Sequence, residues 1–387
     1  ADPARQGTRG GPGVATEGQA GQVASTPGEA PAMSGHAFDP AQAAADLAEF
    51  ARRASELLPT MRVTSEESAG ASARDEVWRR DKVALYRYRP IARPAGLPPV
   101  LIVFALVNRP YILDLAPDRS LIRGLLAAGL DVYLIDWGRP DGTDRYLGLE
   151  DYIEGYLDGA VQEILAGHGI AALNLLGVCQ GGTFSLCYTA RHSGNVRNLI
   201  TMVTPVDFRT PENLLSRWAA GIDVELMAAN GNISGQLMNN AYLALRPFRL
   251  TQQKYVDFVR SGASAARIAE FLRMERWIFD SPDLPAELFR QFVKGLYQEN
   301  GLIAGTLEIG GRKVSLRDIT QPVLNIYATQ DHIVPPSASM PLDRHIASQD
   351  YTAMPVETGH IGMYVSSRAR DAVPPAIAAW LAARPAD

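Results

Sequence analysis

The residues best suited to do chemistry lie at the end of one apolar run. The apolar run that begins at Leu173 ends in the motif Gly177-Val178-Cys179-Gln180-Gly181-Gly182, and a helix-like segment follows. A nucleophile in this Gly-x-Cys-x-Gly setting sits on a strained strand-to-helix turn that lifts its side chain above the sheet. Small flanking residues are needed because strand and helix nearly touch there. We therefore predict that Cys179 is a nucleophile that forms a thioester; the competing interpretation is a glycine-rich turn around a buried thiol.

A cysteine nucleophile needs a base to take its proton and an acid to orient that base. In the α/β-hydrolase arrangement the chain order is nucleophile, acid, histidine, with the last two in loops at the carboxyl ends of late strands. The strand-like segment 322–328 leads into Asp331, and the segment that ends at Val356 leads into His360. We therefore predict Asp331 as the acid and His360 as the base.

His332 is the competing candidate for the base. It adjoins Asp331 in the chain, and two neighbouring loop residues rarely face one another as an acid–base pair. We therefore expect His332 to line the pocket and His360 to be the base. The six histidines show no paired ligand spacing and the two cysteines are too few for a zinc cluster, so no metal site is predicted.

The oxyanion that develops on the substrate needs two backbone N–H donors. One comes from the residue after the nucleophile, Gln180, and the other from the loop after the strand predicted at 100–107. That loop reads Asn108-Arg109-Pro110-Tyr111, and proline has no N–H. The second donor is therefore Asn108 or Arg109; the alternative is a plain turn with a structural arginine.

The elements that must position these residues alternate between strands and helices. Strands are predicted at 82–88, 100–107, 131–136, 173–178, 198–203, 322–328 and 351–356, and helices at 121–128, at 151–166 and directly after Cys179. This alternation predicts an α/β-hydrolase fold, a mostly parallel sheet with helices on both faces. The core would comprise residues 37–204 and 320–387. Residues 205–319 are helical and rich in aromatic residues, with a hairpin at Gly310-Gly311, and are predicted to be an inserted cap.

The amino-terminal segment has a different composition. Residues 1–36 are rich in Gly, Pro and Ala, have little to bury and are predicted to be a disordered tail. An alanine-rich helix is predicted at 39–58. The first 35 residues contain no continuous apolar segment of the kind found in secretory signals, so we expect a cytoplasmic protein.

Overall composition narrows the class of protein further. With 387 residues, 47% of them hydrophobic, the chain can bury a large core. A net charge of -5 without a basic tract argues against a nucleic-acid partner, and no apolar run is long enough to span a membrane. Cys179 and Cys187 would lie about 12 Å apart on one helix, too far for a disulfide, which fits a reducing compartment.

Several segments, taken together with the cysteine turn, resemble one family, the polyhydroxyalkanoate synthases, and in particular the catalytic subunit of the class III enzymes, which make polyesters such as poly(3-hydroxybutyrate). The resemblance runs from about residue 75 to about residue 380. It is carried by the segments 105–111 (ALVNRPY), 131–138, 177–182, 201–208, 271–282, 330–336 and 359–362. The resemblance implies that Cys179, Asp331 and His360 are the catalytic residues.

The resemblance also implies an activity and partners. The enzyme would be an acyltransferase that polymerises (R)-3-hydroxyacyl-CoA, in particular short-chain 3-hydroxybutyryl-CoA, and releases coenzyme A without a further cofactor. It would act at a polyester granule, together with a second, non-catalytic subunit, as a homodimer or hetero-oligomer. Whether His360 or Asp331 activates the attacking hydroxyl is left open by the sequence. A cysteine hydrolase or thioesterase of the same fold is the alternative.

Overall fold

The computed structural model describes residues 72–245, 252–260 and 264–384, together with Ala45, Ala48, Glu49 and Arg52, which are helical. The tail predicted for residues 1–36 lies outside the described residues, as does most of the helix predicted at 39–58. The chain divides into two units, residues 1–49 and 50–387. The following description concerns the second unit.

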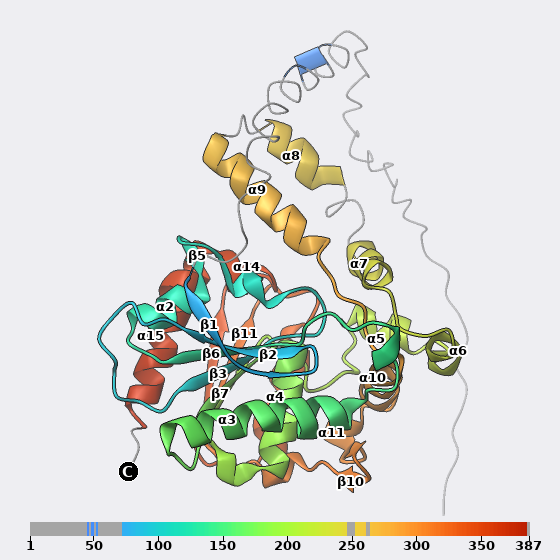
Figure 1. Cartoon of the computed structure of the whole chain (residues 1–387). Coiled ribbons are helices and arrows are strands. Elements are labelled where there is room, and N and C mark those ends of the chain that lie inside the picture. Colours follow the sequence, from blue (N-terminus) through green and yellow to red (C-terminus); the bar gives the residue numbers. More distant parts are fainter. Residues whose placement is uncertain are drawn as a thin grey trace, which may run out of the picture. The chain divides into compact units, whose positions relative to one another are not determined.

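A mostly parallel sheet carries the predicted site residues (Figure 1). Within the described residues it has eight strands in the order β1-β2-β6-β3-β7-β8-β11-β12. The strands are β1 (Arg74–Arg80), β2 (Val83–Tyr88), β3 (Val100–Val103), β6 (Val132–Asp136), β7 (Leu173–Val178), β8 (Val196–Met202), β11 (Val323–Ala328) and β12 (Tyr351–Val356). Pairs β1–β2 and β2–β6 are antiparallel, and the remaining neighbours are parallel. The predicted fold class is confirmed.

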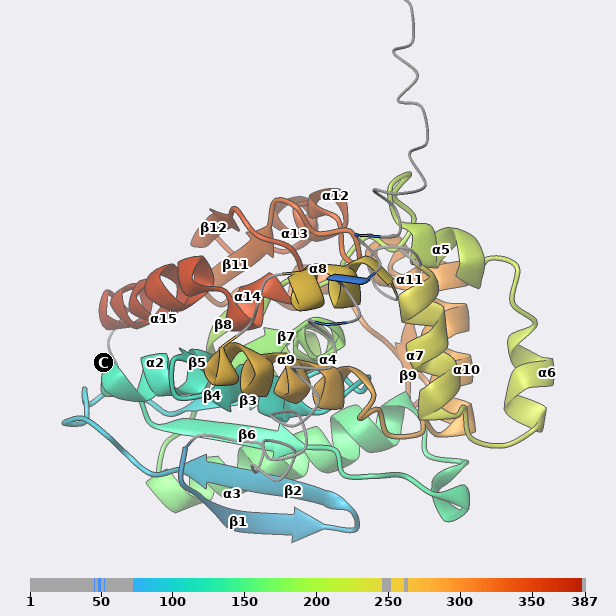
Figure 2. The same ribbon diagram turned by 90° about the horizontal axis from the view of Figure 1, so that it is seen from above.

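Helices cover both faces of this sheet (Figures 1 and 2). They are α2 (Leu121–Ala127), π-helix η3 (Asp151–Leu157), α3 (Asp158–His168), α4 (Gln180–Arg191), α12 (Pro336–Ser339), α13 (Leu342–His345), α14 (Gly362–Val365) and α15 (Ser367–Ala382). Strand β3 shows why its residues are uniformly apolar. Leu101 and Val103 face the cluster that contains η3, α3 and α4, whereas Val100 and Ile102 face the cluster that contains α2 and α15. A strand buried on both sides has no polar face.

Two predicted elements differ from those in the structure. Strand β3 ends at Val103 rather than at residue 107, because the chain turns away where helix α4 crosses its end. A Cβ on Gly181 would lie 2.1 Å from the carbonyl oxygen of Val103, so only glycine permits this crossing. The helix predicted at 151–166 begins as π-helix η3 before it continues as α3. Strand β1 was not predicted: six of its seven residues are exposed, so the sequence lacks a buried alternating face.

The segment between β8 and β11 is mainly helical. Its elements are α5 (Leu214–Ala219), α6 (Val224–Ala229), α7 (Gly235–Ala244), α8 (Lys254–Arg260), α9 (Ala265–Ile278), α10 (Ala286–Phe292), η6 (Val293–Gln298), α11 (Gly301–Ala304), β9 (Glu308–Ile309) and β10 (Arg312–Lys313). Strands β9 and β10 pair as an antiparallel hairpin around Gly310-Gly311, as predicted. The division into a core and a cap at residues 205–319 stays a prediction.

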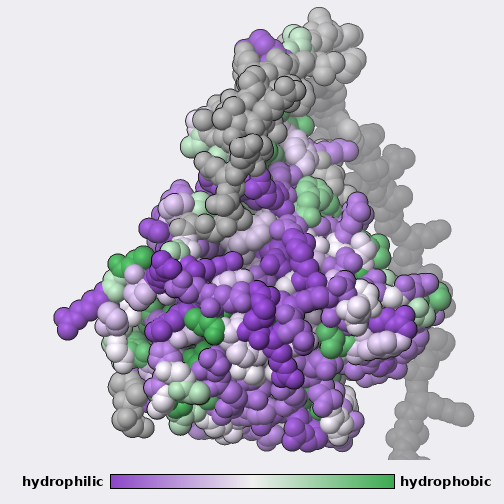
Figure 3. All heavy atoms as spheres, viewed as in Figure 1, coloured by the Kyte–Doolittle hydropathy of each residue, from purple (hydrophilic) through white to green (hydrophobic). Residues whose placement is uncertain are grey.

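Short elements complete the described chain. They are the pair β4 (Asp114–Ala116) and β5 (Arg119–Ser120) and the 3-10 turns η1 (Pro110–Leu113), η2 (Gly142–Asp144), η4 (Ser193–Asn195) and η7 (Leu316–Asp318). The face seen in Figure 3 is largely hydrophilic, with scattered apolar residues. In the part of the chain that the structure describes, no helix combines the length and apolar character needed to cross a membrane.

Candidate active site

Cys179 lies at the sharp turn between β7 and α4. Its backbone has φ of 55° and ψ of -123°, a conformation that is strained for a residue with a side chain. The turn is held by hydrogen bonds from the Cys179 N–H to the Met202 carbonyl, 2.9 Å, and from the Gly182 N–H to the Cys179 carbonyl, 2.9 Å. A Cβ on Gly177 would lie 2.4 Å from the Gly182 Cα. The glycines thus let strand and helix approach as the sequence predicted.

His360 lies in the loop after β12 and pairs with Asp331 in the loop after β11. Its Nδ1 is 2.6 Å from Asp331 Oδ2, and the two side chains are 5% and 0% exposed. The other carboxylate oxygen, Oδ1, accepts the backbone N–H groups of Ile333 at 2.8 Å and Val334 at 2.9 Å. Both oxygens of Asp331 are therefore engaged in orienting the imidazole and the loop.

The charge state of His360 follows from these contacts. Burial by itself lowers the pKa of His360, but the negative charges of Asp331 and Cys179, with hydrogen bonds to both, outweigh it and raise the pKa to about 10. At neutral pH the resting imidazole therefore holds two protons. With Nδ1 donating to Asp331, the other nitrogen, Nε2, is the one available for chemistry.

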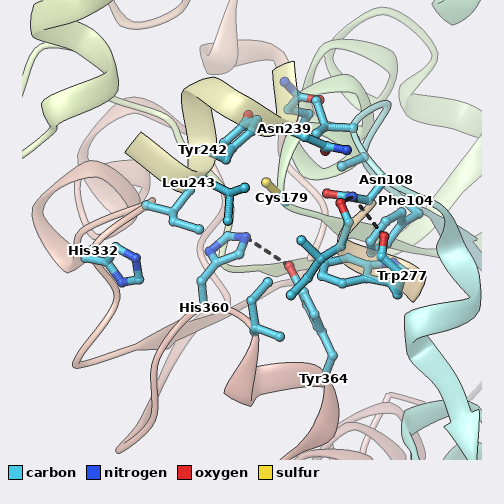
Figure 4. Close-up of a pocket in the computed structure, with 16 residues that line it drawn as sticks. Phe104, Asn108, Cys179, Asn239, Tyr242, Leu243, Trp277, His332, His360 and Tyr364 are labelled. Carbon is cyan, nitrogen blue, oxygen red and sulfur yellow. Dashed lines mark hydrogen bonds between the residues drawn. The ribbon is translucent and has the colours of Figure 1, made fainter. Parts of the chain in front are cut away.

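The side chains of Cys179 and His360 border one cavity of about 140 Å³ (Figure 4). Its lining is largely apolar and includes Tyr242 and Leu243 from α7 and Trp277 from α9. The predicted site residues Cys179, Gln180, Asn108, His332 and His360 all line it. Asp331 does not, so its carboxylate lies behind His360 as seen from the cavity.

Tyr364 is a pocket residue that sequence reasoning missed. Its hydroxyl lies 3.0 Å from His360 Nε2, and Figure 4 shows the two side chains directed toward one another. A signal was available, because Tyr364 follows His360 by one helical turn and such residues share a side of a helix. The sequence did not show that the segment turns helical there, since α14 has only four residues.

The two candidates for the second oxyanion donor occupy different surroundings. Asn108 lines the cavity with φ of 62°, and its side-chain Nδ2 donates to Trp277 O at 3.1 Å and Ser281 Oγ at 2.9 Å. The Arg109 side chain turns away toward Asp136, with an N–O distance of 2.8 Å. This contrast favours Asn108, whose role as a backbone donor stays a prediction together with that of Gln180.

A second apolar cavity, of about 220 Å³, adjoins the first. Gln180 and Tyr242 line both cavities, so these two residues stand between them. The other walls come mainly from helices α5, α7 and α10, with side chains such as Leu288 and Phe292. The cavity at Cys179 thus lies beside a second apolar cavity.

The remaining candidate ligands form no evident metal site. Among the described residues, no group of three His, Cys, Asp or Glu side chains is placed to hold a metal ion. Cys187 is buried in α4, and burial raises the pKa of its thiol to about 12. It packs as a small residue within the hydrophobic core.

Two family models match this chain. A family model described as alpha/beta hydrolase fold matches residues 98–366, and one described as Poly-beta-hydroxybutyrate polymerase (PhaC) N-terminus matches residues 62–125. A monoacylglycerol lipase structure from Paleococcus ferrophilus, 18% identical, aligns over 78% of this chain and 99% of its own with a TM-score of 0.47.

Two curated relatives are much more similar in sequence. The poly(3-hydroxyalkanoate) polymerase subunit PhaC of Allochromatium vinosum is 51% identical over 339 residues, 87% of this chain and 96% of the relative. The subunit PhaC of Synechocystis sp. is 48% identical over 323 residues, 81% of this chain and 85% of the relative. The resemblance noted from the motifs is confirmed: the chain belongs to the poly(3-hydroxyalkanoate) polymerase family and, within it, to the PhaC subunits of the class III type.

Proposed function

We propose that this chain polymerises (R)-3-hydroxyacyl groups, in particular 3-hydroxybutyryl groups, from their coenzyme A thioesters through a thioester on Cys179. The observation that carries the proposal is the elbow cysteine facing an imidazole that a buried carboxylate orients, all bordering an apolar pocket. Family membership supports the same activity. The alternative, a cysteine hydrolase, is supported by the shared fold alone. The similar curated relatives are named polymerase subunits.

Acylation starts from the protonated imidazole of His360 beside the Cys179 sulfur, which reacts as the thiolate. The sulfur then attacks the substrate carbonyl, and the imidazolium gives a proton to the sulfur of departing coenzyme A. The oxyanion would be held by the backbone N–H groups of Gln180 and Asn108. One thioester replaces another, so the acyl group stays activated on the enzyme.

Elongation needs the 3-hydroxyl of a second substrate to attack the Cys179 thioester. The new ester is more stable than the thioester, so chain growth is favourable. The ester product still carries coenzyme A at its other end, and the freed thiolate attacks that thioester to release it. A single reactive thiol therefore suffices, in agreement with the burial of Cys187.

The apolar surroundings support polymer formation over hydrolysis. Water that entered the pocket would release a free hydroxy acid, and the aromatic and aliphatic walls from α7 and α9 leave few polar groups to bind it. The adjoining apolar cavity offers room for an acyl chain beyond Tyr242. We propose that coenzyme A enters only as part of the substrate and that no other cofactor takes part.

The partners are also proposals. The chain would act on the surface of the insoluble polyester that it makes, in the cytoplasm, and work with a second, non-catalytic subunit in a hetero-oligomer or as a homodimer. A subunit that binds an open state of the 205–319 segment better than a closed one would shift the chain toward activity. Without that subunit we expect a lag or a low rate, which adding it relieves; a full initial rate without it would contradict this role.

The central experiment incubates the purified chain with (R)-3-hydroxybutyryl-CoA and follows coenzyme A release and polymer together. We expect both to rise, with ester-linked polymer accounting for the coenzyme A released. Release of coenzyme A with free 3-hydroxybutyrate as the product would instead establish the hydrolase.

A further inference from the structure

Tyr364 places a phenol hydroxyl at the working nitrogen of His360. The two atoms, Tyr364 Oη and His360 Nε2, are 3.0 Å apart, and the rings meet edge-on with centroids 5.7 Å apart. Phe104 packs edge-on against the other part of the tyrosine ring, at 5.9 Å. The ring is 4% exposed and lines the cavity beside Cys179. The hydroxyl is therefore held in a fixed place within the pocket.

The environment keeps this hydroxyl protonated. Burial raises the pKa of Tyr364 well above 10, and the negative charges of Cys179 and Asp331 raise it further. A neutral phenol can donate one proton and accept another at the same oxygen. Such a group can pass a proton on without ever carrying a charge.

The two half-reactions make different demands on His360. In the free enzyme the imidazole of His360 is already protonated at neutral pH, so acylation needs no further proton from Cys179. In the acyl-enzyme the sulfur has no proton and no charge, and the imidazole is neutral because coenzyme A has left with a proton. Nε2 then accepts from the Tyr364 hydroxyl, which borders the same cavity.

We propose that Tyr364 relays the proton of the attacking 3-hydroxyl to His360 during elongation. This inference rests on the proposed function. As the hydroxyl oxygen bonds to the acyl carbon, its proton moves to Tyr364 Oη and the Tyr364 proton moves to His360 Nε2. The carbon–sulfur bond then breaks, which leaves a Cys179 thiolate beside an imidazolium. No proton or electron pair is left over.

The carboxylate of Asp331 is poorly placed for the same task. One of its oxygens is bound to His360 Nδ1 and the other to two backbone N–H groups. Asp331 also does not line the cavity into which the substrate must fit. Tyr364, in contrast, lines that cavity and contacts His360 Nε2 directly.

The test separates acylation from elongation in Tyr364→Phe, which removes only the hydroxyl. Butyryl-CoA lacks the 3-hydroxyl, so it can acylate Cys179 but cannot elongate; rapid quenching measures the one equivalent of coenzyme A released. Polymerisation of 3-hydroxybutyryl-CoA measures both steps. We expect acylation within about threefold of the natural chain and elongation at least about tenfold slower, the low end of what general acid–base groups contribute.

The chain offers a matched control in Tyr133→Phe. Tyr133 makes the same kind of contact, with 2.9 Å between its hydroxyl oxygen and His168 Nε2 and centroids 5.8 Å apart. Neither residue lines the cavity of Cys179. Both variants lose a comparable hydrogen bond, but only Tyr364→Phe should lose elongation. If Tyr364→Phe folds poorly, 3-fluorotyrosine at position 364 can replace it, because this residue keeps the hydroxyl. It should change the rate of elongation and leave the rate of acylation unchanged.

The outcomes are distinct. Equal slowing of acylation and elongation would mean that Tyr364 only positions His360, and would overturn the relay. Unchanged elongation in Tyr364→Phe would overturn it as well. Absence of labelling and polymer in the natural chain would instead refute the proposed function itself.

Discussion

Histidine, aspartate and tyrosine come together in two regions of this molecule, and the two clusters differ in ways that matter for chemistry. His360 is bound by Asp331 at Nδ1 and by Tyr364 at Nε2, on opposite sides of the ring. At His168, the last residue of α3, the Tyr133 hydroxyl at 2.9 Å and an Asp131 oxygen at 3.4 Å both approach Nε2.

Their surroundings differ as well. Asp331 is fully buried and receives two backbone N–H groups, whereas Asp131 is 21% exposed and binds the Arg87 guanidinium at 2.8 and 3.0 Å. His168 is 25% exposed, and no nucleophile faces it in the described structure. The same residue types therefore form the predicted base in one place and a surface cluster in the other. Burial, the choice of ring nitrogen and an adjacent thiol make the difference.

The largest loss of activity is expected from removing the thiol of Cys179, because the His168 cluster has no thiol beside it. Cys179→Ala should abolish coenzyme A release, yet keep the fold, because a thiol-to-methyl change is small in volume. Circular dichroism and acyl labelling measure the two properties. Cys187→Ala is the matched control and should keep both labelling and turnover. Normal turnover by Cys179→Ala would refute its role as nucleophile.

The next effect compares the two histidines directly. His360→Gln should slow acylation about 10²- to 10⁴-fold, the range typical of a lost general acid–base group. His168→Gln should leave it within about twofold, since His168 borders no part of the cavity. Single-turnover coenzyme A release measures both. Similar rates in the two variants would leave the base unassigned.

The aspartates give a prediction about stability and pH. Because the pKa of His360 is raised from 6.5 to about 10, its pairing stabilises the fold fully below pH 6.5, and the stabilisation is lost as the pH rises toward 10. Asp331→Asn should therefore cost about 3–5 kcal/mol near pH 6, typical of a broken buried pair, and less at pH 9 to 10. Denaturant unfolding measures this. Asp131→Asn, in a partly exposed cluster, should cost less than about 1 kcal/mol.

The activity of Asp331→Asn also resolves the role of the carboxylate. Because both of its oxygens are engaged behind His360, we expect acylation and elongation to slow together. A variant that acylates normally but cannot elongate would show instead that Asp331 acts directly on the hydroxyl.

The smallest effect is expected from His332→Ala. His332 lines the cavity and follows Asp331, but the Asp331 carboxylate is bound to His360. Acylation should fall by less than about tenfold, measured beside His360→Gln. A loss as large as that of His360→Gln would revive His332 as the base.

The amino-acid sequence by itself was enough to predict the parts of the site whose geometry is local. The spacing of Gly177 and Gly181 around Cys179 predicts the elbow, because only glycine fits where β7, β3 and α4 meet. Residues that follow parallel strands must gather at one edge of the sheet, and this predicts Asp331 and His360 together.

Features that depend on contacts between distant segments could be found only in the tertiary structure. The end of β3 at Val103 is decided by the crossing of α4, and the apolar walls of the pocket come from α7 and α9, far along the chain from Cys179. Tyr364 was missed because a four-residue helix carries too little periodicity to reveal its face. His360 and His168 differ in burial and in the ring nitrogen that the carboxylate approaches. These differences, like the position of Tyr364, follow from how the helices and strands pack.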